Sequence, residues 1–99
     1  MALHFKTDIQ TRDGFTVSNA YGRVGADDSF TGTHINGHVE IYVSEQAFID
    51  GLRPVKTTLI QDCYEPYNRE IDGTDILNIA HNALIVNLAK QNIIAEKEL

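Results

Sequence analysis

The chain has 99 residues, of which 42% are hydrophobic and 22% charged, with a formal net charge of −6 at pH 7 and a single cysteine. This length and composition suit one folded domain with a modest core, and the lone Cys63 excludes an internal disulfide and fits a reducing compartment. Because Lys and Arg do not cluster and no apolar run approaches the roughly 20 residues that cross a bilayer, neither nucleic acid nor a membrane is expected as a partner.

Residues 1–24 predict a β-hairpin. Apolar and polar side chains alternate over 3–10 and again over 15–24, which is the pattern of half-buried strands. Between them, Asp13 and Gly14 form a turn signal, because glycine accepts a positive φ. In the second strand the larger side chains are expected to face inward and the smaller ones to allow another backbone to approach. The inward set is Phe15, Val17 and Tyr21, and the small set is Thr16, Ser18, Ala20 and Gly22.

The middle of the chain predicts a loop, two strands and a short helical turn. Residues 25–37 are rich in Gly, Asp, Ser and Thr and are expected to form an exposed loop. A strand over 37–44 follows, and Ser44 can cap a helical turn that Gly51 ends. A fourth strand is expected over 55–64, where β-branched residues alternate with others. The third strand should bury Val39, Ile41 and Val43.

The C-terminal part changes to a helical period and predicts a helix over 75–97, with a break or bend near residues 90–92. Asp72 is expected to cap its start, and Asp75 to reach back from the third helical position. The apolar face comprises Ile76, Ile79, Ala80, Ala83, Leu84 and Val86, and the opposite polar face comprises Asn78, His81, Asn82 and Asn92. Ile85 interrupts the polar face.

Together these elements predict a single α+β domain over residues 1–99. Four antiparallel strands would form a small sheet, either open or closing toward a barrel or sandwich, with one long C-terminal helix over one face. The expected strands are about 3–10, 15–24, 37–44 and 55–64. A four-stranded sheet leaves two edges that need partners or protection.

The candidates for metal binding do not reach the required donor sets. His34 and His38 are four residues apart and can point the same way, but no third ligand stands at a characteristic spacing. Residues 68–75 resemble a calcium loop only superficially, because Asp75 and Ile79 occupy the positions that require an apolar residue and a bidentate Glu. No metal site and no cofactor are therefore expected.

No catalytic residue is expected either. Cys63 lies beside Asp62 and close to Glu65, and carboxylates raise the pKa of a thiol rather than activating it. A packed structural cysteine is the favoured interpretation. No glycine-rich phosphate loop and no serine in a nucleophile-elbow context are present.

Six residues are candidates for contacts with other chains: Ile85, Ile93, Ile94, Tyr64, Tyr67 and Phe30. The three isoleucines would add apolar surface beyond what one sheet can cover, which favours self-association or a stable partner. Tyr64 and Tyr67 flank Pro66 and would form a contact patch, although tyrosines at a strand end also serve as lids over a core. Phe30 is one of two large apolar residues in the expected 25–37 loop.

The order of segments carries a resemblance. "MALHFKTDIQ" leads into "GFTVSNAYGRV", then "HVEIYVSEQAFIDGLRPV", and a helix closes the chain. This order resembles a group of small tail-associated structural proteins of tailed bacteriophages and prophages, most specifically in "NAYGRV" and in "VEIYVSEQAF" with the following Gly and Pro. The C-terminus departs from the aromatic-bearing ends of that group, so the partner of the helix is open.

The resemblance implies a non-enzymatic virion component, at the tail tip, baseplate or neck, that acts through protein–protein contacts. It would be made in the bacterial host cytoplasm and would assemble with other virion structural proteins or with copies of itself. The alternative is a small acidic regulatory or inhibitory binding protein, which would need a concentrated acidic face. An enzyme ranks third, because His34 and His38 would have to converge with distant carboxylates.

Overall fold

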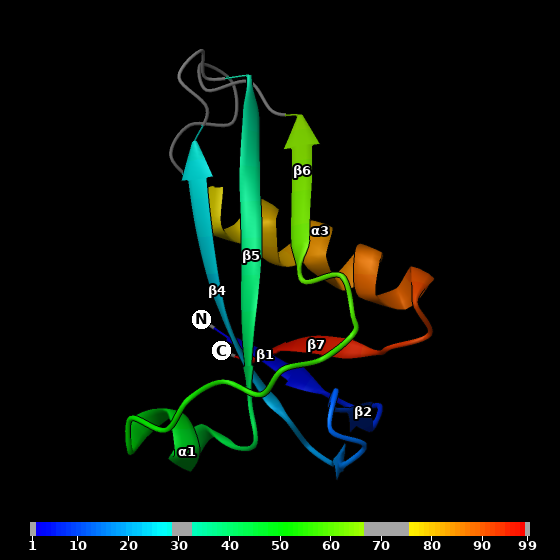
Figure 1. Ribbon diagram of the computed structural model, residues 1–99. Helices are drawn as coiled ribbons and strands as arrows, with labels where there is room; N and C mark the ends of the chain where they lie inside the picture. Colours follow the sequence, from blue (N-terminus) through cyan, green and yellow to red (C-terminus); the bar gives the residue numbers. More distant parts are fainter. Residues whose placement is uncertain (1, 29–32, 67–75, 99) are drawn as a thin grey trace.

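The computed structural model describes residues 2–28, 33–66 and 76–98 as an α+β fold (Figure 1). Five antiparallel strands form a curled sheet in the order β6-β5-β4-β1-β7, where four strands were expected, and helix α3 lies against one face. The elements of this layer are β1 (Ala2–Phe5), β4 (Tyr21–Asp28), β5 (His34–Tyr42), β6 (Asp62–Pro66), β7 (Ala95–Glu98) and α3 (Ile76–Lys90). Outside it lie the two-stranded pair β2 (Ile9–Gln10) and β3 (Thr16–Val17) and the short helix α1 (Glu45–Ile49).

The N-terminal hairpin is confirmed, but each of its strands is broken in two. β1 pairs with β4 and β2 pairs with β3, around a turn in which Gly14 has φ 90°. Between β3 and β4, Asn19 takes a φ of 56°, which interrupts the alternation of the strand. Of the expected inward set, Val17 and Tyr21 are buried and Phe15 is wrong, because it is exposed. Gly22 of the small set is buried as well, against Phe5 and Val39.

The loop expected over residues 25–37 is largely paired β-structure. β4 and β5 continue their ladder up to the pair Asp28 and Ile35, so residues 25–28 and 34–37 of the expected loop lie in strands. One of the glycines that favoured a loop has a packing role instead. Gly37 faces α3, where a Cβ at this position would meet Cys63 Sγ at 2.5 Å and Ala80 Cβ at 3.2 Å.

Helix α1 begins at the expected cap. The Ala47 backbone N–H donates to Ser44 Oγ at 3.1 Å, and Gly51, at φ 76°, follows the end of the helix. Phe48 anchors the helix, because its ring packs against those of Tyr21 and Tyr42 at centroid distances of 5.8 and 5.1 Å. Val43, which was expected to be buried, is exposed because β5 ends one residue earlier.

The strand expected over residues 55–64 is present only as β6, which starts at Asp62. The preceding stretch is irregular and attaches to the N-terminal hairpin instead, through a single bridge between Thr57 and Thr11. The Arg12 backbone N–H also donates to the Lys56 carbonyl at 2.8 Å. This stretch thus connects the N-terminal hairpin to β6 through backbone hydrogen bonds rather than as a strand.

Helix α3 ends at Lys90, which confirms the break expected near residues 90–92. Asn92 has φ 65°, and backbone N–H groups of Asn92 and Ile93 donate to the carbonyls of Ala89 and Leu88. This is the Schellman arrangement, with Asn92 as the left-handed residue. The helix expected up to residue 97 is wrong beyond this point, because β7 forms there and pairs with β1. The expected caps Asp72 and Asp75 lie outside the described residues.

The rotation of α3 differs from the expected one. Its buried residues are Ala80, His81, Leu84 and Leu88, and Val86 is exposed. His81, expected on the surface, has 0% exposure; its Nδ1 donates to the Leu77 carbonyl at 2.6 Å, while its Nε2 has no hydrogen-bond partner. Apolar residues occur on both sides of this helix, so its pattern was compatible with more than one rotation. The core below it includes Leu3, Phe5, Ile9, Val39, Ile41, Leu84 and Leu88.

Candidate interaction surface

In the described part of the chain, α3 covers one face of the β4–β5–β6 part of the sheet and no helix or strand covers the other (Figure 1). On the other face, which we call the open face, the register pairs Asp27 with Asn36, His38 with Asp62, and Asn36 with Tyr64. The described side chains of this face are polar or aromatic, and Gly25 leaves a hollow of about 660 Å³ among them.

His38 and Asp62 form a close pair on the open face. His38 Nδ1 lies 2.7 Å from Asp62 Oδ1, and its Nε2 lies 3.9 Å from Glu40 Oε1. All three side chains are at least half exposed to solvent. The neighbouring Cys63 does not join them, because its thiol packs against Gly37 on the opposite face. Carboxylates therefore orient this imidazole without placing a thiol beside it.

The two histidines of β5 lie on the same face, as their spacing predicted, but they are far apart. Four residues along a strand span about 13 Å, whereas ligands of one zinc ion lie about 2 Å from the metal. The His34 ring stacks instead on Tyr64, with 4.6 Å between centroids. Across residues 2–28, 33–66 and 76–98, no three His, Cys, Asp or Glu side chains gather as a metal site.

Cys63 is a buried thiol. Burial raises the pKa of the Cys63 thiol, the backbone of Gly37 partly opposes this by a hydrogen bond, and Glu65 and Asp62 raise it further. The carboxylates act in the direction predicted from the sequence, but burial is the larger cause. Because the thiolate is the nucleophilic form, this environment opposes reactivity.

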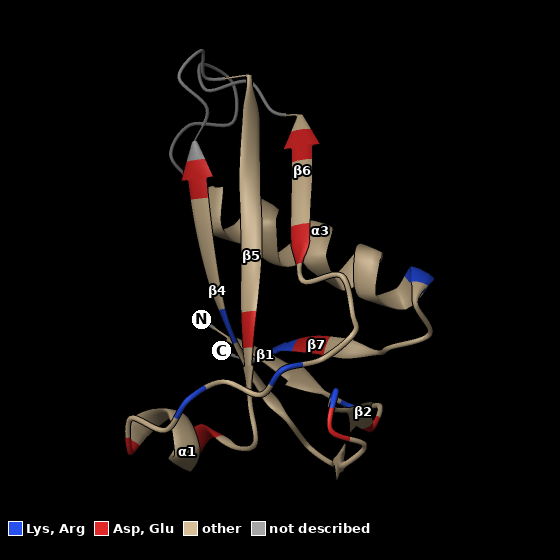
Figure 2. Cartoon of the chain, viewed as in Figure 1, with Lys and Arg blue, Asp and Glu red and all other residues tan. Residues whose placement is uncertain are grey.

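Charge is unevenly distributed along the molecule (Figure 2). The free end of the sheet, formed by residues 24–28, 34–38 and 62–66, contains acidic residues and no Lys or Arg; we call it the acidic end. The Lys and Arg residues of the described chain lie elsewhere, along the other end of the sheet, its connections and the end of α3.

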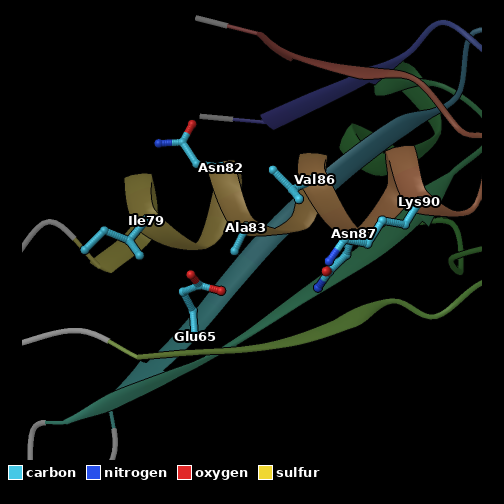
Figure 3. Close-up of a pocket in the computed structure, with 7 residues that line it drawn as sticks. All are labelled: Glu65, Ile79, Asn82, Ala83, Val86, Asn87 and Lys90. Atoms are coloured by element: carbon cyan, nitrogen blue, oxygen red, sulfur yellow. The ribbon is translucent and has the colours of Figure 1, made fainter.

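A groove of about 370 Å³ lies between the end of β6 and the outer side of α3 (Figure 3). Ile79, Ala83 and Val86 provide its apolar wall, Glu65 reaches in from β6, and Lys90 lies at the far end. We call this the β6–α3 groove. The sequence did not predict it, because Val86 was expected in the core and Glu65 is distant from α3 along the chain.

Three exposed apolar residues lie in or beside α1. Val43, Ile49 and Leu52 are 52%, 63% and 60% exposed, although they lie within ten residues of one another. We call these three residues the α1 surface. Sequence reasoning missed it because the expected strand ending at residue 44 placed Val43 inside.

The six residues proposed from the sequence for contacts fall into three groups. Tyr64 is exposed on the open face and Ile94 is 60% exposed. Ile93 is only 8% exposed, so the exposure expected for it is wrong, and Ile85 is partly buried where it packs against the core. Ile93 is drawn inward by the Schellman turn, and Ile85 by the rotation of α3. Tyr67 and Phe30 lie outside the described residues.

Comparisons of the chain with protein-family models, with curated proteins and with solved structures find no match in any of the three. In the described part of the chain, no helix has both the length and the apolar character required to cross a membrane.

Proposed function

We propose that this protein is a non-enzymatic structural component of a tailed-phage virion, at the tail tip, baseplate or neck, and acts through protein–protein contacts. The resemblance of "NAYGRV" and "VEIYVSEQAF" to tail-associated proteins supports the virion setting. The observation that carries the proposal is the α1 surface, because three large apolar side chains stand exposed within ten residues.

The anchoring of α1 supports a role in docking. Phe48 packs between Tyr21 and Tyr42, and the Arg23 guanidinium lies 4.8 Å from the centre of the Phe48 ring. Scattered exposed apolar residues are common in proteins, but here Ile49 lies in a helix that Phe48 holds against the sheet, and Val43 and Leu52 flank that helix in the sequence. A partner that covers Ile49 and Leu52 removes apolar surface from water while ordering little additional chain.

The partners in this proposal are other virion structural proteins, further copies of this chain, or both. Assembly would follow synthesis in the bacterial host cytoplasm, and the mature location would be the virion. Nucleic acid is disfavoured as a partner, since the acidic end carries no Lys or Arg in residues 24–28, 34–38 and 62–66.

The acidic end favours a second candidate function, a small regulatory or inhibitory binding protein with an acidic recognition surface. Asp27, Asp62 and Glu65 lie at one end of the sheet, which is more concentrated than their positions in the sequence indicated. A protein of this kind would bind a partner in the cell and would be absent from finished particles.

The test is incorporation into particles. The phage or lysogen that encodes the chain is grown with the wild-type protein, with Ile49→Glu, or with Gln10→Glu, which adds the same charge at an exposed site on β2. Particles are purified on a density gradient, and the protein is quantified by mass spectrometry. We expect wild type and Gln10→Glu in the particles and about tenfold less Ile49→Glu, because burying a new carboxylate in the contact is costly.

Circular dichroism of the purified variants serves as the folding control, and both are expected to melt within a few degrees of the wild type. Absence of the wild-type protein from particles would overturn the virion proposal. Its recovery in a complex with a cellular protein would then favour the regulatory function. Normal incorporation of Ile49→Glu would show that the α1 surface is not the contact.

A further inference from the structure

Within the described residues, strand β6 has a neighbouring strand on one side only, β5. The Val39 backbone N–H donates to the Gln61 carbonyl at 2.9 Å, so the hydrogen-bonded pairs of this ladder continue at every second residue, through Cys63 and Glu65. The backbone groups of Asp62 and Tyr64 therefore point to the outer side of β6. Pro66 carries no N–H, which limits the available donors to this short stretch.

The β6–α3 groove lies beside this outer side. α3 continues past β6 behind the sheet (Figures 1 and 3), and among the described strands none covers Val86, which is exposed, while Ala83 beside it is partly buried. A strand added next to β6 would pair with the Asp62 and Tyr64 backbone. Every second side chain of that strand would rest on Ala83 and Val86, where the small side chain of Ala83 leaves room.

We propose that the β6–α3 groove binds an extended, lysine- or arginine-bearing segment of a partner protein as a sixth strand of the sheet. This inference rests on the proposed function as an assembly component and specifies one of its contacts. Strand addition to an open edge takes its affinity from backbone hydrogen bonds and its specificity from pockets for alternate side chains. The groove supplies an apolar wall for one set of side chains.

Charge complementarity decides the chemistry of the segment. Glu65 reaches into the groove, Asp62 lies on the open face of the same strand, and the acidic end contains no Lys or Arg in its described residues. An added strand thus meets carboxylates from β6 on both faces, which favours basic side chains in the segment. Lys90 stands only at the far end of the groove.

A second copy of the chain fits this edge less well. Its own open edge, β7, has the sequence AEKE, so Glu96 would come beside the carboxylates of β6. Like charges on neighbouring strands are destabilising. α3 of that copy also already packs against β7. A separate extended segment is the better occupant.

The probe is a short capped peptide in which lysine and valine alternate, titrated into the intact protein by calorimetry and followed by amide chemical shifts. Two control peptides replace lysine by glutamate or carry N-methyl groups on alternate backbone nitrogens. We expect the lysine peptide to bind with shifts at Glu65, Ala83 and Val86, and both controls to bind about tenfold more weakly or not at all.

Two pairs of protein variants locate the site. Tyr64→Pro removes an outward N–H and Tyr64→Val keeps it, so we expect about tenfold weaker binding for the proline variant only. Val86→Lys places a like charge in the groove, whereas Leu77→Lys adds the same charge at another exposed position of α3. Only Val86→Lys should weaken binding, and this pair decides the matter if Tyr64→Pro does not fold.

Three results would overturn the inference: no binding of the lysine peptide, equal binding of the glutamate peptide, or shifts confined to residues outside β6 and α3. Self-association that Tyr64→Pro abolishes would assign the edge to a second copy instead. Failure here and failure of the proposed function are distinct outcomes. A protein that enters particles without binding the peptide refutes only the strand addition, and one that binds the peptide but is absent from particles refutes only the virion role.

Discussion

At the scale of single residues, small side chains determine how closely α3 approaches the sheet. Gly37 lies under Ala80, and Gly22 lies between Phe5 and Val39. Neither glycine has a positive φ, so their role is the space they leave. Two layers at this separation bury Leu84 and Leu88 fully.

Gly37→Ala is expected to destabilise the protein. Its Cβ would meet Cys63 Sγ at 2.5 Å and Ala80 Cβ at 3.2 Å, and overpacking of this kind costs about 1–3 kcal/mol. Gly25→Ala is the matched control in the same hairpin, because a Cβ there has no atom within 4 Å. Its free energy of unfolding should change by no more than about 1 kcal/mol, in either direction. Urea denaturation measures both, and equal losses would contradict the packing argument.

The stability of the protein is expected to decline at alkaline pH because of Cys63. Burial raises the pKa of this thiol above its ordinary value of 9.0, so the native state retains a proton that the unfolded chain releases. The contribution is constant below the unfolded pKa and is lost as pH rises through the folded pKa. The measurement is urea denaturation of wild type and Cys63→Ala between pH 7 and pH 10, about the range in which a free thiol titrates. As pH rises, the free energy of unfolding of the wild type should fall relative to that of Cys63→Ala.

The difference in pH dependence between wild type and Cys63→Ala reports on Cys63, because both proteins retain Tyr42, whose titration also affects stability. The pKa of Tyr42 is also raised, first by burial and then by the hydrogen bond to Glu40, and its own decline starts from an ordinary value of 10.0. Native Cys63 should also react slowly with iodoacetamide until denaturant is added. Parallel pH curves for the two proteins would show that the thiol is not desolvated.

At the scale of elements, the end of α3 directs the chain into the sheet. Asn92 takes the left-handed conformation, Ile93 turns back onto Leu88, and β7 starts two residues later. Gln91 reinforces this corner, since its amide bonds to both the N–H and the carbonyl of Ile60. The positive φ of Asn92 therefore ends α3 and turns the chain toward β7.

Substitution of Asn92 should follow backbone preference rather than side-chain size. Glycine adopts a φ of 65° freely, so Asn92→Gly is expected to leave stability equal or slightly higher. Asn92→Ala should cost about 1 kcal/mol, because the left-handed conformation crowds Cβ against the following carbonyl. Thermal unfolding of both variants gives the comparison. A loss for Asn92→Gly as large as that for Asn92→Ala would instead indicate an essential side-chain contact.

At the scale of the whole molecule, the two ends of the described chain complete the sheet together. β1 and β7 are neighbours, and the ends of the chain lie close to one another in Figure 1. Ile93 and Ala95 belong to the same core cluster as Leu3 and Phe5. The sheet therefore joins the first and last strands across almost the full length of the sequence.

Deletion of residues 93–99 is expected to unfold the protein. It removes Ile93 and Ala95 from the core and leaves β1 without one of its two neighbours. Several kcal/mol are lost in this way, from a total that is about 5–15 kcal/mol for a domain of this kind. Circular dichroism and limited proteolysis would reveal the unfolding, and a synthetic peptide of residues 93–99 should restore part of the fold.

Glu96→Gln is the control for this deletion. It changes the same strand but removes only an exposed ion pair, in which Lys6 Nζ lies 3.7 Å from Glu96 Oε2, and should cost less than about 1 kcal/mol. A deletion variant that keeps native protease resistance would show that β7 is dispensable.

Local features of the fold were predictable from the sequence because they depend on near neighbours. The turn at Gly14, the Ser44 cap and the interruption at residues 90–92 each depend on a few adjacent residues, and the structure contains all three. The alternation of Val39 and Ile41 likewise indicated the buried face of β5. The exposed positions of Tyr64 and Ile94 were also anticipated, whereas their role as contacts stays a prediction.

The sequence by itself thus determined the turn at Gly14, the start of α1, the break after α3 and the α+β class of the fold. Tertiary structure decided the rest. With apolar residues on several sides of α3, only packing on the sheet selected the rotation that buries His81 and exposes Val86. Residues 95–98, expected to be helical, form β7 because the edge of β1 offers them a strand to pair with. The β6–α3 groove depends on both outcomes, because Glu65 and Val86 meet only after the sheet and the helix have taken their places.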